Sequence, residues 1–183
     1  ANEGDTLLIF STEIDITQEP VFAPRRDRRG GPDEIEYEWR DDTEDDGPDY
    51  NWIDVSNREG VVAVQFGNDT NRGPYDLGFE FNFYGNAYNQ VRMCSNGWAS
   101  FTNSRTYYQY SNWDELPSAS APENFLCVAM SDWNPAAGGG SYYFWSDDET
   151  AVMTWENVPH ISGQGRWTFQ IVLTIDGMIK YQY

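Results

Sequence analysis

The sequence is poor in the residues on which most hydrolases and zinc proteins depend. It has a single histidine, His160, and two cysteines, Cys94 and Cys127. A catalytic triad or a histidine zinc site would have to use His160, which lies in a loop-like stretch with no serine elbow or second histidine beside it. The cysteine spacing matches no zinc pattern and leaves two alternatives open, one buried disulfide or two buried thiols.

Long apolar runs and basic residues are scarce as well. No stretch approaches the roughly 18 apolar residues of a membrane span, so we expect no membrane insertion. Lys180 is the one lysine, and 30 acidic residues stand against 11 basic ones, for a net charge of -19. Such a surface repels phosphate backbones and attracts cations, which excludes nucleic acid as a partner class. We expect an acidic protein that is secreted, extracellular or at the cell surface.

The sequence does contain stretches in which apolar and polar residues alternate with period two. Many of the apolar residues are aromatic, which make up 16% of the chain. Leu77, Phe79, Phe81 and Phe83 alternate with small or polar residues, as do the apolar residues of 152–156 and 167–175. This pattern is typical of strands with one buried face. We expect further strands at 6–14, 35–39, 50–55, 61–66, 88–94, 97–103, 124–130, 141–146 and 178–183.

Turn residues separate these strands. Asp176-Gly177 and Asn96-Gly97 are strong hairpin signals, and Gly85-Asn86 turns the chain after the Phe-rich strand. No convincing helix longer than a turn or two is present. The pattern predicts an all-β protein, an antiparallel, jelly-roll-like β-sandwich with an N-terminal extension and long loops.

Two regions are expected. Residues 1–36 form an N-terminal strand and a linker rich in proline, arginine and glycine, and 37–183 form the sandwich domain. The final strand runs to the last residue, from which we expect a module of a longer protein. The strand at 6–14 either covers a sheet edge or pairs with another copy of the chain.

An acidic loop is the candidate metal site. Asp42, Glu44 and Asp46 occupy the first, third and fifth positions of a segment whose sixth residue is Gly47, as in the first half of a calcium loop. The twelfth position is Ile53, where a calcium loop needs a bidentate glutamate. The loop is therefore either a weak Ca²⁺ site or a solvated acidic turn, and no other cofactor is indicated.

Aromatic residues supply the candidate ligand site. The segment 106–113 carries four rings without clean alternation, and these either stack on a sugar or a partner protein or fold over the sandwich: Tyr107, Tyr108, Tyr110 and Trp113. The repeated phrases Tyr37-x-Trp39-x-Asp41 and Tyr50-x-Trp52-x-Asp54 have a simpler interpretation. Their rings are expected to pack across strands or against a sheet.

Several stretches, in order, resemble the nidogen-like β-sandwich module. They are Pro74-Tyr-Asp-Leu-Gly-Phe-Glu-Phe-Asn-Phe-Tyr-Gly85, Val91-Arg-Met-Cys-Ser-Asn-Gly-Trp-Ala-Ser-Phe101, Ser120-Ala-Pro-Glu-Asn-Phe-Leu126, Trp133-Asn-Pro135, Val152-Met-Thr-Trp-Glu-Asn-Val-Pro159, Phe169-Gln-Ile171 and Asp176-Gly-Met-Ile-Lys-Tyr-Gln-Tyr183. Gly30-Gly-Pro-Asp33 and Tyr37-Glu-Trp39 resemble the opening of bacterial versions. Cys94 and Cys127 depart from the small residues of the family pattern, and Ser131-Asp132-Trp133 departs from its more acidic phrase, which weakens a family metal site there.

The resemblance implies a non-catalytic extracellular module in adhesion or matrix-like proteins, and it supplies no catalytic residue. We expect the loops to recognise a protein or a carbohydrate. One alternative is a structural subunit of an extracellular polymer, joined to copies of itself by strand addition through 6–14. A less favoured alternative is an accessory domain of a secreted hydrolase, which would need convergent carboxylates in a deep cleft.

Overall fold

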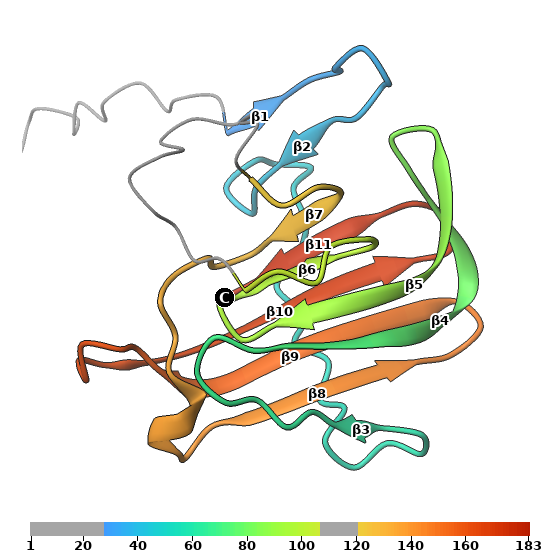
Figure 1. The fold of residues 1–183 in the computed structure, drawn as a ribbon. Coiled ribbons are helices and arrows are strands. Elements are labelled where there is room, and N and C mark those ends of the chain that lie inside the picture. Colours follow the sequence, from blue (N-terminus) through green and yellow to red (C-terminus); the bar gives the residue numbers. More distant parts are fainter. Residues whose placement is uncertain (1–27, 107–120) are drawn as a thin grey trace, which may run out of the picture. The chain divides into compact units, whose positions relative to one another are not determined.

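The structure is a computed structural model that describes residues 28–106 and 121–183 (Figure 1). The strand predicted at 6–14 and the first part of the linker lie outside these residues. The chain divides into two compact units, Ala1–Pro48 and Asp49–Tyr183. Each unit is described by itself below.

The first unit contains a short hairpin in which β1 (Arg29–Gly30) pairs with β2 (Trp39–Arg40). The turn between them is held by Asp33, whose carboxylate accepts hydrogen bonds from the backbone N–H groups of Ile35 and Tyr37, each at 2.9 Å. Because the chain turns here, the strand predicted at 35–39 is wrong except at its last residue. A Cβ at Gly30 would clash with the Trp39 indole, so glycine is required where the two strands meet.

The second unit is a sandwich of two antiparallel sheets. One sheet has the order β11-β10-β9-β8-β3 and the other the order β4-β5-β6-β7. The strands of the first are β3 (Val62–Ala63), β8 (Ser141–Ser146), β9 (Thr150–Pro159), β10 (Arg166–Thr174) and β11 (Ile179–Gln182), and those of the second are β4 (Asn71–Phe83), β5 (Asn86–Cys94), β6 (Trp98–Ser100) and β7 (Phe125–Cys127).

This architecture confirms the predicted all-β sandwich. Within each sheet consecutive strands are neighbours over most of its width, so the topology is a pair of meanders and differs from the strand exchange of a jelly roll. The hairpins predicted at Asp176-Gly177 and Asn96-Gly97 are confirmed as the β10–β11 and β5–β6 connections. Among the described residues the one helical segment is the 3₁₀ turn η2 (Pro135–Ala137).

The core lies between the two sheets. The alternating apolar residues of β4, from Leu77 to Phe83, are all buried as predicted. The indole N–H of Trp155 on β9 donates to the backbone oxygen of Cys94 on β5 at 3.0 Å and so ties one sheet to the other. Neither cysteine is in a disulfide, which resolves the open alternative in favour of two thiols. Burial raises the pKa of the Cys94 thiol to about 12, so it packs as an apolar group.

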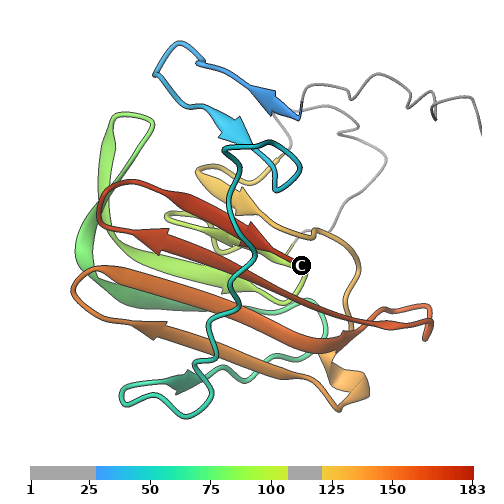
Figure 2. The same ribbon diagram turned by 180° about the vertical axis from the view of Figure 1, so that it is seen from behind.

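An extended segment, residues 49–55, crosses the outer face of the five-stranded sheet, as Figure 2 shows. It was predicted to be a strand, but it runs across the strands and makes no ladder with them. The side-chain amide of Gln170 bonds both the N–H and the C=O of Ile53, each at 3.1 Å. Gln182 accepts from Asn51 N–H at 2.8 Å and donates to Gln170 at 2.7 Å. We call residues 49–55 the strap.

The strap corrects the prediction that each strand buries one face. Gln170 occupies a polar position of the β10 alternation and is fully buried, because the strap covers it. Farther along the same outer face, Val55 packs in one cluster with Trp145, Val152 and Val172. Both faces of the five-stranded sheet are therefore buried along the strap, the inner face by the second sheet and the outer face by this segment.

Candidate recognition site at the loop end of the sandwich

Four loop segments gather at one end of the sandwich, and Asn96 holds three of them together. Its side-chain amide donates to Asp69 at 2.8 Å and to the backbone oxygen of Thr106 at 2.9 Å. Its side-chain oxygen accepts from Trp133 N–H at 3.1 Å, and the residue is fully buried. These satisfied bonds make Asn96 the fixed centre of an otherwise irregular surface. We call the segments 64–70, 94–97, 129–140 and 159–166, together with Tyr142 of β8 and Trp167 of β10, which pack against them, the loop end.

An aromatic group lies in the loop end. Trp133 packs against Trp167, with ring centroids 5.0 Å apart, and edge-on against His160 at 5.5 Å. Trp133 is buried, whereas Trp167 is 45% exposed. Trp167 was predicted to be buried with the inward residues of β10. It is exposed because it stands at the start of the strand, at the margin of the core. An indole that is packed on one side and open on the other offers a rigid contact face.

A β-bulge shapes this end of the sheet. The pairing of β9 with β10 shifts between Trp167 and Phe169, and Asn157, opposite the shift, adopts a positive φ of 53°. The Asn157 side chain donates to Gly139 O at 2.7 Å, and the Arg166 guanidinium donates to Gly138 O at 3.0 Å. The bulge thus presents two side chains that clamp the turn after η2.

Among residues 28–106 and 121–183, the hydrogen bonds of the His160 ring go to its own loop. Its Nδ1 lies 2.7 Å from the Ser162 hydroxyl and accepts from Ser162 N–H at 3.2 Å. Since Nδ1 accepts, the neutral ring carries its proton on Nε2. A triad histidine would have its Nδ1–H oriented by a carboxylate, and this contact is with the histidine's own loop. His160 is therefore a structural member of the aromatic group.

Three buried side-chain oxygens at the loop end have no hydrogen-bond partner within the described part of the chain. They are Asp132 Oδ1, Asn134 Oδ1 and Tyr142 Oη, and they flank the turn around η2. Burial, reinforced by repulsion from Asp69, raises the pKa of Asp132. Buried polar atoms require a hydrogen-bond partner, which an ordered water or a bound ligand can supply at these three positions.

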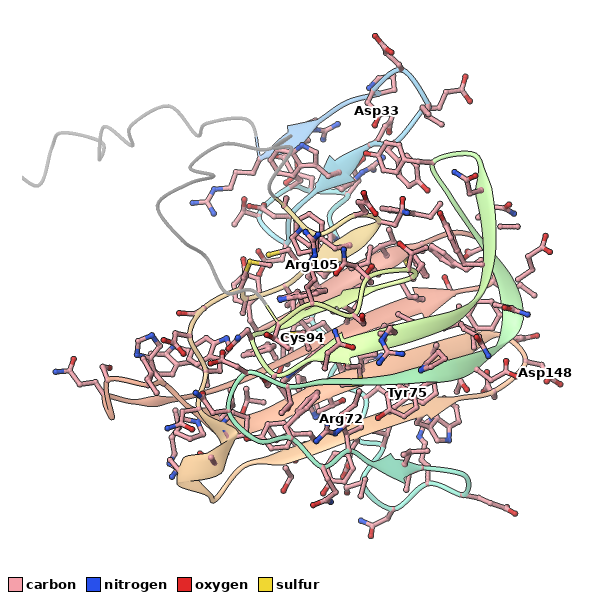
Figure 3. The ribbon with its side chains drawn as sticks, in the orientation of Figure 1. Asp33, Arg72, Tyr75, Cys94, Arg105 and Asp148 are labelled. Atoms are coloured by element: carbon pink, nitrogen blue, oxygen red, sulfur yellow. The ribbon has the colours of Figure 1, made fainter. Side chains whose placement is uncertain are left out.

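A cavity of about 280 Å³ lies beside η2, where β8 begins. Its walls include Gln65 and Phe66 from the segment after β3, Pro135 from η2, and Tyr142 from β8. Arg72 of β4 holds this part of the wall in place, because its Nε donates a hydrogen bond to the backbone oxygen of Gln65 at 2.8 Å. Figure 3 shows Arg72 on β4, together with Tyr75, whose ring stacks on Phe144 of β8.

The structure bears differently on the predicted ligand-binding residues and on the predicted metal-binding residues. Tyr107, Tyr108, Tyr110 and Trp113 lie outside the described residues, so their role stays a prediction. In the acidic loop, Glu44 and Asp46 accept salt bridges from Arg29 at 3.0 and 2.9 Å, and Arg40 also bonds Asp46.

Asp42 is exposed. No group of three or more metal-ligating side chains occurs within residues 28–106 and 121–183. Calcium binding at Asp42, Glu44 and Asp46 therefore stays a prediction. A bound ion would have to displace the guanidinium groups of Arg29 and Arg40 from these carboxylates.

The repeated aromatic phrases were predicted to pack across strands or against a sheet; Tyr37 and Trp52 are partly buried, whereas the other two rings are exposed. Tyr50 is 62% exposed on the strap, and Trp39 is 58% exposed, with one edge of its indole against Gly30. The sequence reasoning also missed the loop-end residues themselves. In the sequence, Trp167 and Trp133 look like ordinary core residues. The one sequence signal near this site was the Asn96-Gly97 turn, which contains the residue that holds the loops together.

Similarity to known proteins identifies the family of this chain. No curated protein and no solved structure gave a significant match. Among the described residues there is no helix long and apolar enough to cross a membrane. A family model described as NIDO related matches residues 47–183, about three quarters of the chain. That match begins just before the strap and covers both sheets and the whole loop end. The chain therefore belongs to the nidogen-related family, as the stretches quoted from its sequence implied.

Proposed function

We propose that this protein is a non-catalytic recognition module that binds an extracellular protein or carbohydrate through the loop end of its sandwich. Membership of the nidogen-related family suggests an extracellular, non-enzymatic module. The observation that carries the finer proposal is an exposed indole at the same end of the fold as three buried oxygens that have no hydrogen-bond partner among the described residues. Binding sites characteristically combine an apolar contact face with a few convergent polar groups.

The scaffold supports this role because the loop end is tied to the rigid part of the molecule. Asn96 joins the loops to the β5–β6 turn, and Trp133 N–H and Asn134 N–H are both bonded, the latter to Pro159 O at 2.8 Å. Loops fixed in this way lose little conformational entropy when a ligand binds. A recognition surface gains affinity from such preorganisation without any chemical step.

The hydrolase alternative has less support. His160 is bonded to Ser162, and of the two neighbouring carboxylates at the loop end, Asp132 has a pKa raised by burial, while Asp69 is engaged as the hydrogen-bond acceptor of the Asn96 amide. Glycoside hydrolysis requires two carboxylates that face a shared substrate with distinct acid and base roles. The assembly alternative depends on residues 6–14, which lie outside the described residues, and it remains a second proposal for that segment.

The test uses the full chain, fluorescently labelled, on a glycan array and on immobilised extracellular matrix proteins. We expect saturable binding that Trp167→Ala reduces at least tenfold, because the exposed indole supplies the largest apolar contact. Trp39→Ala, which removes an exposed indole from the first unit, is the matched control and should leave binding unchanged. Binding that survives Trp167→Ala, or no binding above a heat-denatured sample, would refute the proposal.

A further inference from the structure

We infer that Asn68 is an acceptor for an N-linked glycan, so that the loop end carries a modification site. Asn68-Asp69-Thr70 has the acceptor pattern, an asparagine followed two positions later by threonine with a residue other than proline between them. Every other asparagine of the chain lacks serine or threonine at the second position after it. This inference goes beyond the proposed recognition function and does not depend on it.

Asn68 lies at the surface, where an attached glycan would project into solvent. The residue is exposed and forms part of the turn between β3 and β4. Its Nδ2 donates a hydrogen bond at 3.1 Å to the carboxylate of Asp69, which is also exposed. A glycan replaces one of the two hydrogens on Nδ2, and the remaining N–H can keep this bond. The folded chain can therefore carry the modification without giving up that hydrogen bond.

The backbone around Asn68 is fixed by its neighbours in the turn. The Thr70 hydroxyl accepts a hydrogen bond from Gly67 N–H and donates one to Gly67 O, both at 3.1 Å, which closes the turn. Thr70 N–H donates to the Ser95 hydroxyl at 2.9 Å, and Thr70 O accepts from Ser95 N–H at 2.8 Å. The turn is thereby held against the connection between β5 and β6 through Thr70, and the glycan would be attached at a fixed point of the loop end.

The fold explains Thr70 but gives no structural reason for an asparagine at position 68. Asparagine is favoured in turns because its side chain bonds the backbone two residues on and because it tolerates a positive φ. Neither reason applies here, since Thr70 N–H donates to Ser95 and the positive φ of 48° belongs to Asp69. A role as glycan acceptor accounts for the asparagine, and the threonine hydroxyl then serves both the acceptor pattern and the folded turn.

The reaction is the transfer of an oligosaccharide from a polyprenyl-phosphate carrier. The Asn68 Nδ2 forms a bond with the anomeric carbon of the sugar, and the bond from that carbon to the phosphate oxygen of the carrier breaks. The phosphate leaves with the bonding electron pair, the amide gives up one proton, and no group is oxidised or reduced. The acceptor pattern belongs to secreted proteins, which agrees with the extracellular context that membership of the nidogen-related family suggests.

The test is peptide mass spectrometry of the full chain as its source organism secretes it. Trypsin cleaves after Arg58 and Arg72 and so releases Asn68 in the peptide 59–72. We expect this peptide to carry the added mass of one oligosaccharide, and fragmentation should locate that mass on Asn68. Asn68→Gln, expressed in the same organism, should lose the added mass completely. Asn57→Gln, at an exposed asparagine outside the acceptor pattern, is the matched control and should keep the glycan.

A folding control accompanies the variant. Asn68→Gln changes an exposed side chain, so its tryptophan fluorescence and its cooperative melting should match those of a folded sandwich, and a missing glycan then reports the acceptor. An unmodified 59–72 peptide in the secreted wild type, or an oligosaccharide that persists on this peptide in Asn68→Gln, overturns the inference. Either result leaves the proposed function standing, because that function is judged by the binding of Trp167→Ala.

Discussion

The bonding of the strap through one glutamine side chain leads to a sharp prediction. Replacing Gln170 with methionine keeps the length and nearly the volume of the side chain but removes all of its hydrogen bonds. Gln170 accepts from Ile53 N–H and from Gln182, and it donates to Ile53 O and to Thr154 Oγ1, with the four distances between 2.7 and 3.2 Å. Gln182 and Lys180 bond the strap nearer its start, at Asn51 N–H and Asp49 O, so Gln170 is the side chain that holds its middle at Ile53.

The magnitude follows from counting these bonds. A buried hydrogen bond contributes about 0.5–1.5 kcal/mol net, and its loss costs more when the partner stays buried and unpaired. Ile53 is half-buried, so water can replace part of its bonding, whereas Gln182 and Thr154 are fully buried. We therefore expect Gln170→Met to lower the free energy of unfolding by about 3–4 kcal/mol, a large share of the roughly 5–15 kcal/mol of an ordinary domain.

Urea unfolding monitored by tryptophan fluorescence measures this loss, and hydrogen exchange at residues 50–56 locates it. The exchange of the strap amides should accelerate more than that of β9, because the strap is released first. Gln90→Met, at an exposed position of β5, is the matched control and should change stability by less than about 0.5 kcal/mol. A Gln170→Met loss below about 1 kcal/mol, with strap exchange unchanged, would refute the reasoning.

Three further predictions concern titratable groups. Native protein should not react with a disulfide-exchange reagent at Cys94 at pH 8, because burial raises the pKa of that thiol to about 12, and fast labelling before unfolding would contradict this. Burial raises the pKa of Asp132 above 3.8 in the folded state, so the ionised carboxylate destabilises the fold as the pH rises past that value. Asp132→Asn should therefore melt at the wild-type temperature at pH 3 and at a higher temperature than the wild type at pH 7. A lower melting temperature of the variant at pH 7 would show that the pKa of Asp132 is not raised. Arg29→Gln releases Glu44 and leaves Asp46 paired with Arg40 alone, so calorimetry should find calcium binding tighter than the millimolar binding expected of the wild type. Equal or absent heats in both proteins would leave the loop a solvated turn.

Most of the sandwich could be predicted from local pattern alone. The alternation in β4 marks its buried side chains correctly, and the Asp-Gly and Asn-Gly pairs mark hairpins that exist. Local signals succeed there because a strand with one buried face and a tight turn each place their requirements on neighbouring residues. The strand predicted at 50–55 failed for the opposite reason, since an extended chain has the same side-chain period whether or not it joins a ladder.

The candidate site was less predictable than the fold. The four aromatic residues chosen from the sequence lie outside the described residues, while the loop-end residues come from segments distant in sequence. Asn96 bonds residues that are 10 to 37 positions away, and nothing in its own neighbourhood marks those partners. The unpaired hydroxyl of Tyr142 is likewise invisible in one dimension, because a tyrosine at that position of a strand reads as an ordinary inward residue.

By itself, the sequence determined the class of structure, the hairpins, the inward-facing residues of β4 and the net charge of -19, since each depends on composition or on residues a few positions apart. It also determined the family, whose motifs follow one another in order along the chain. Only the tertiary structure decided that Gln170 and Gln182 are buried beneath a strap, that the cysteines remain thiols, and that an exposed indole and three unpaired oxygens share one end of the fold. These depend on which distant segments come together, and a pattern of local hydrophobicity holds no information about such contacts.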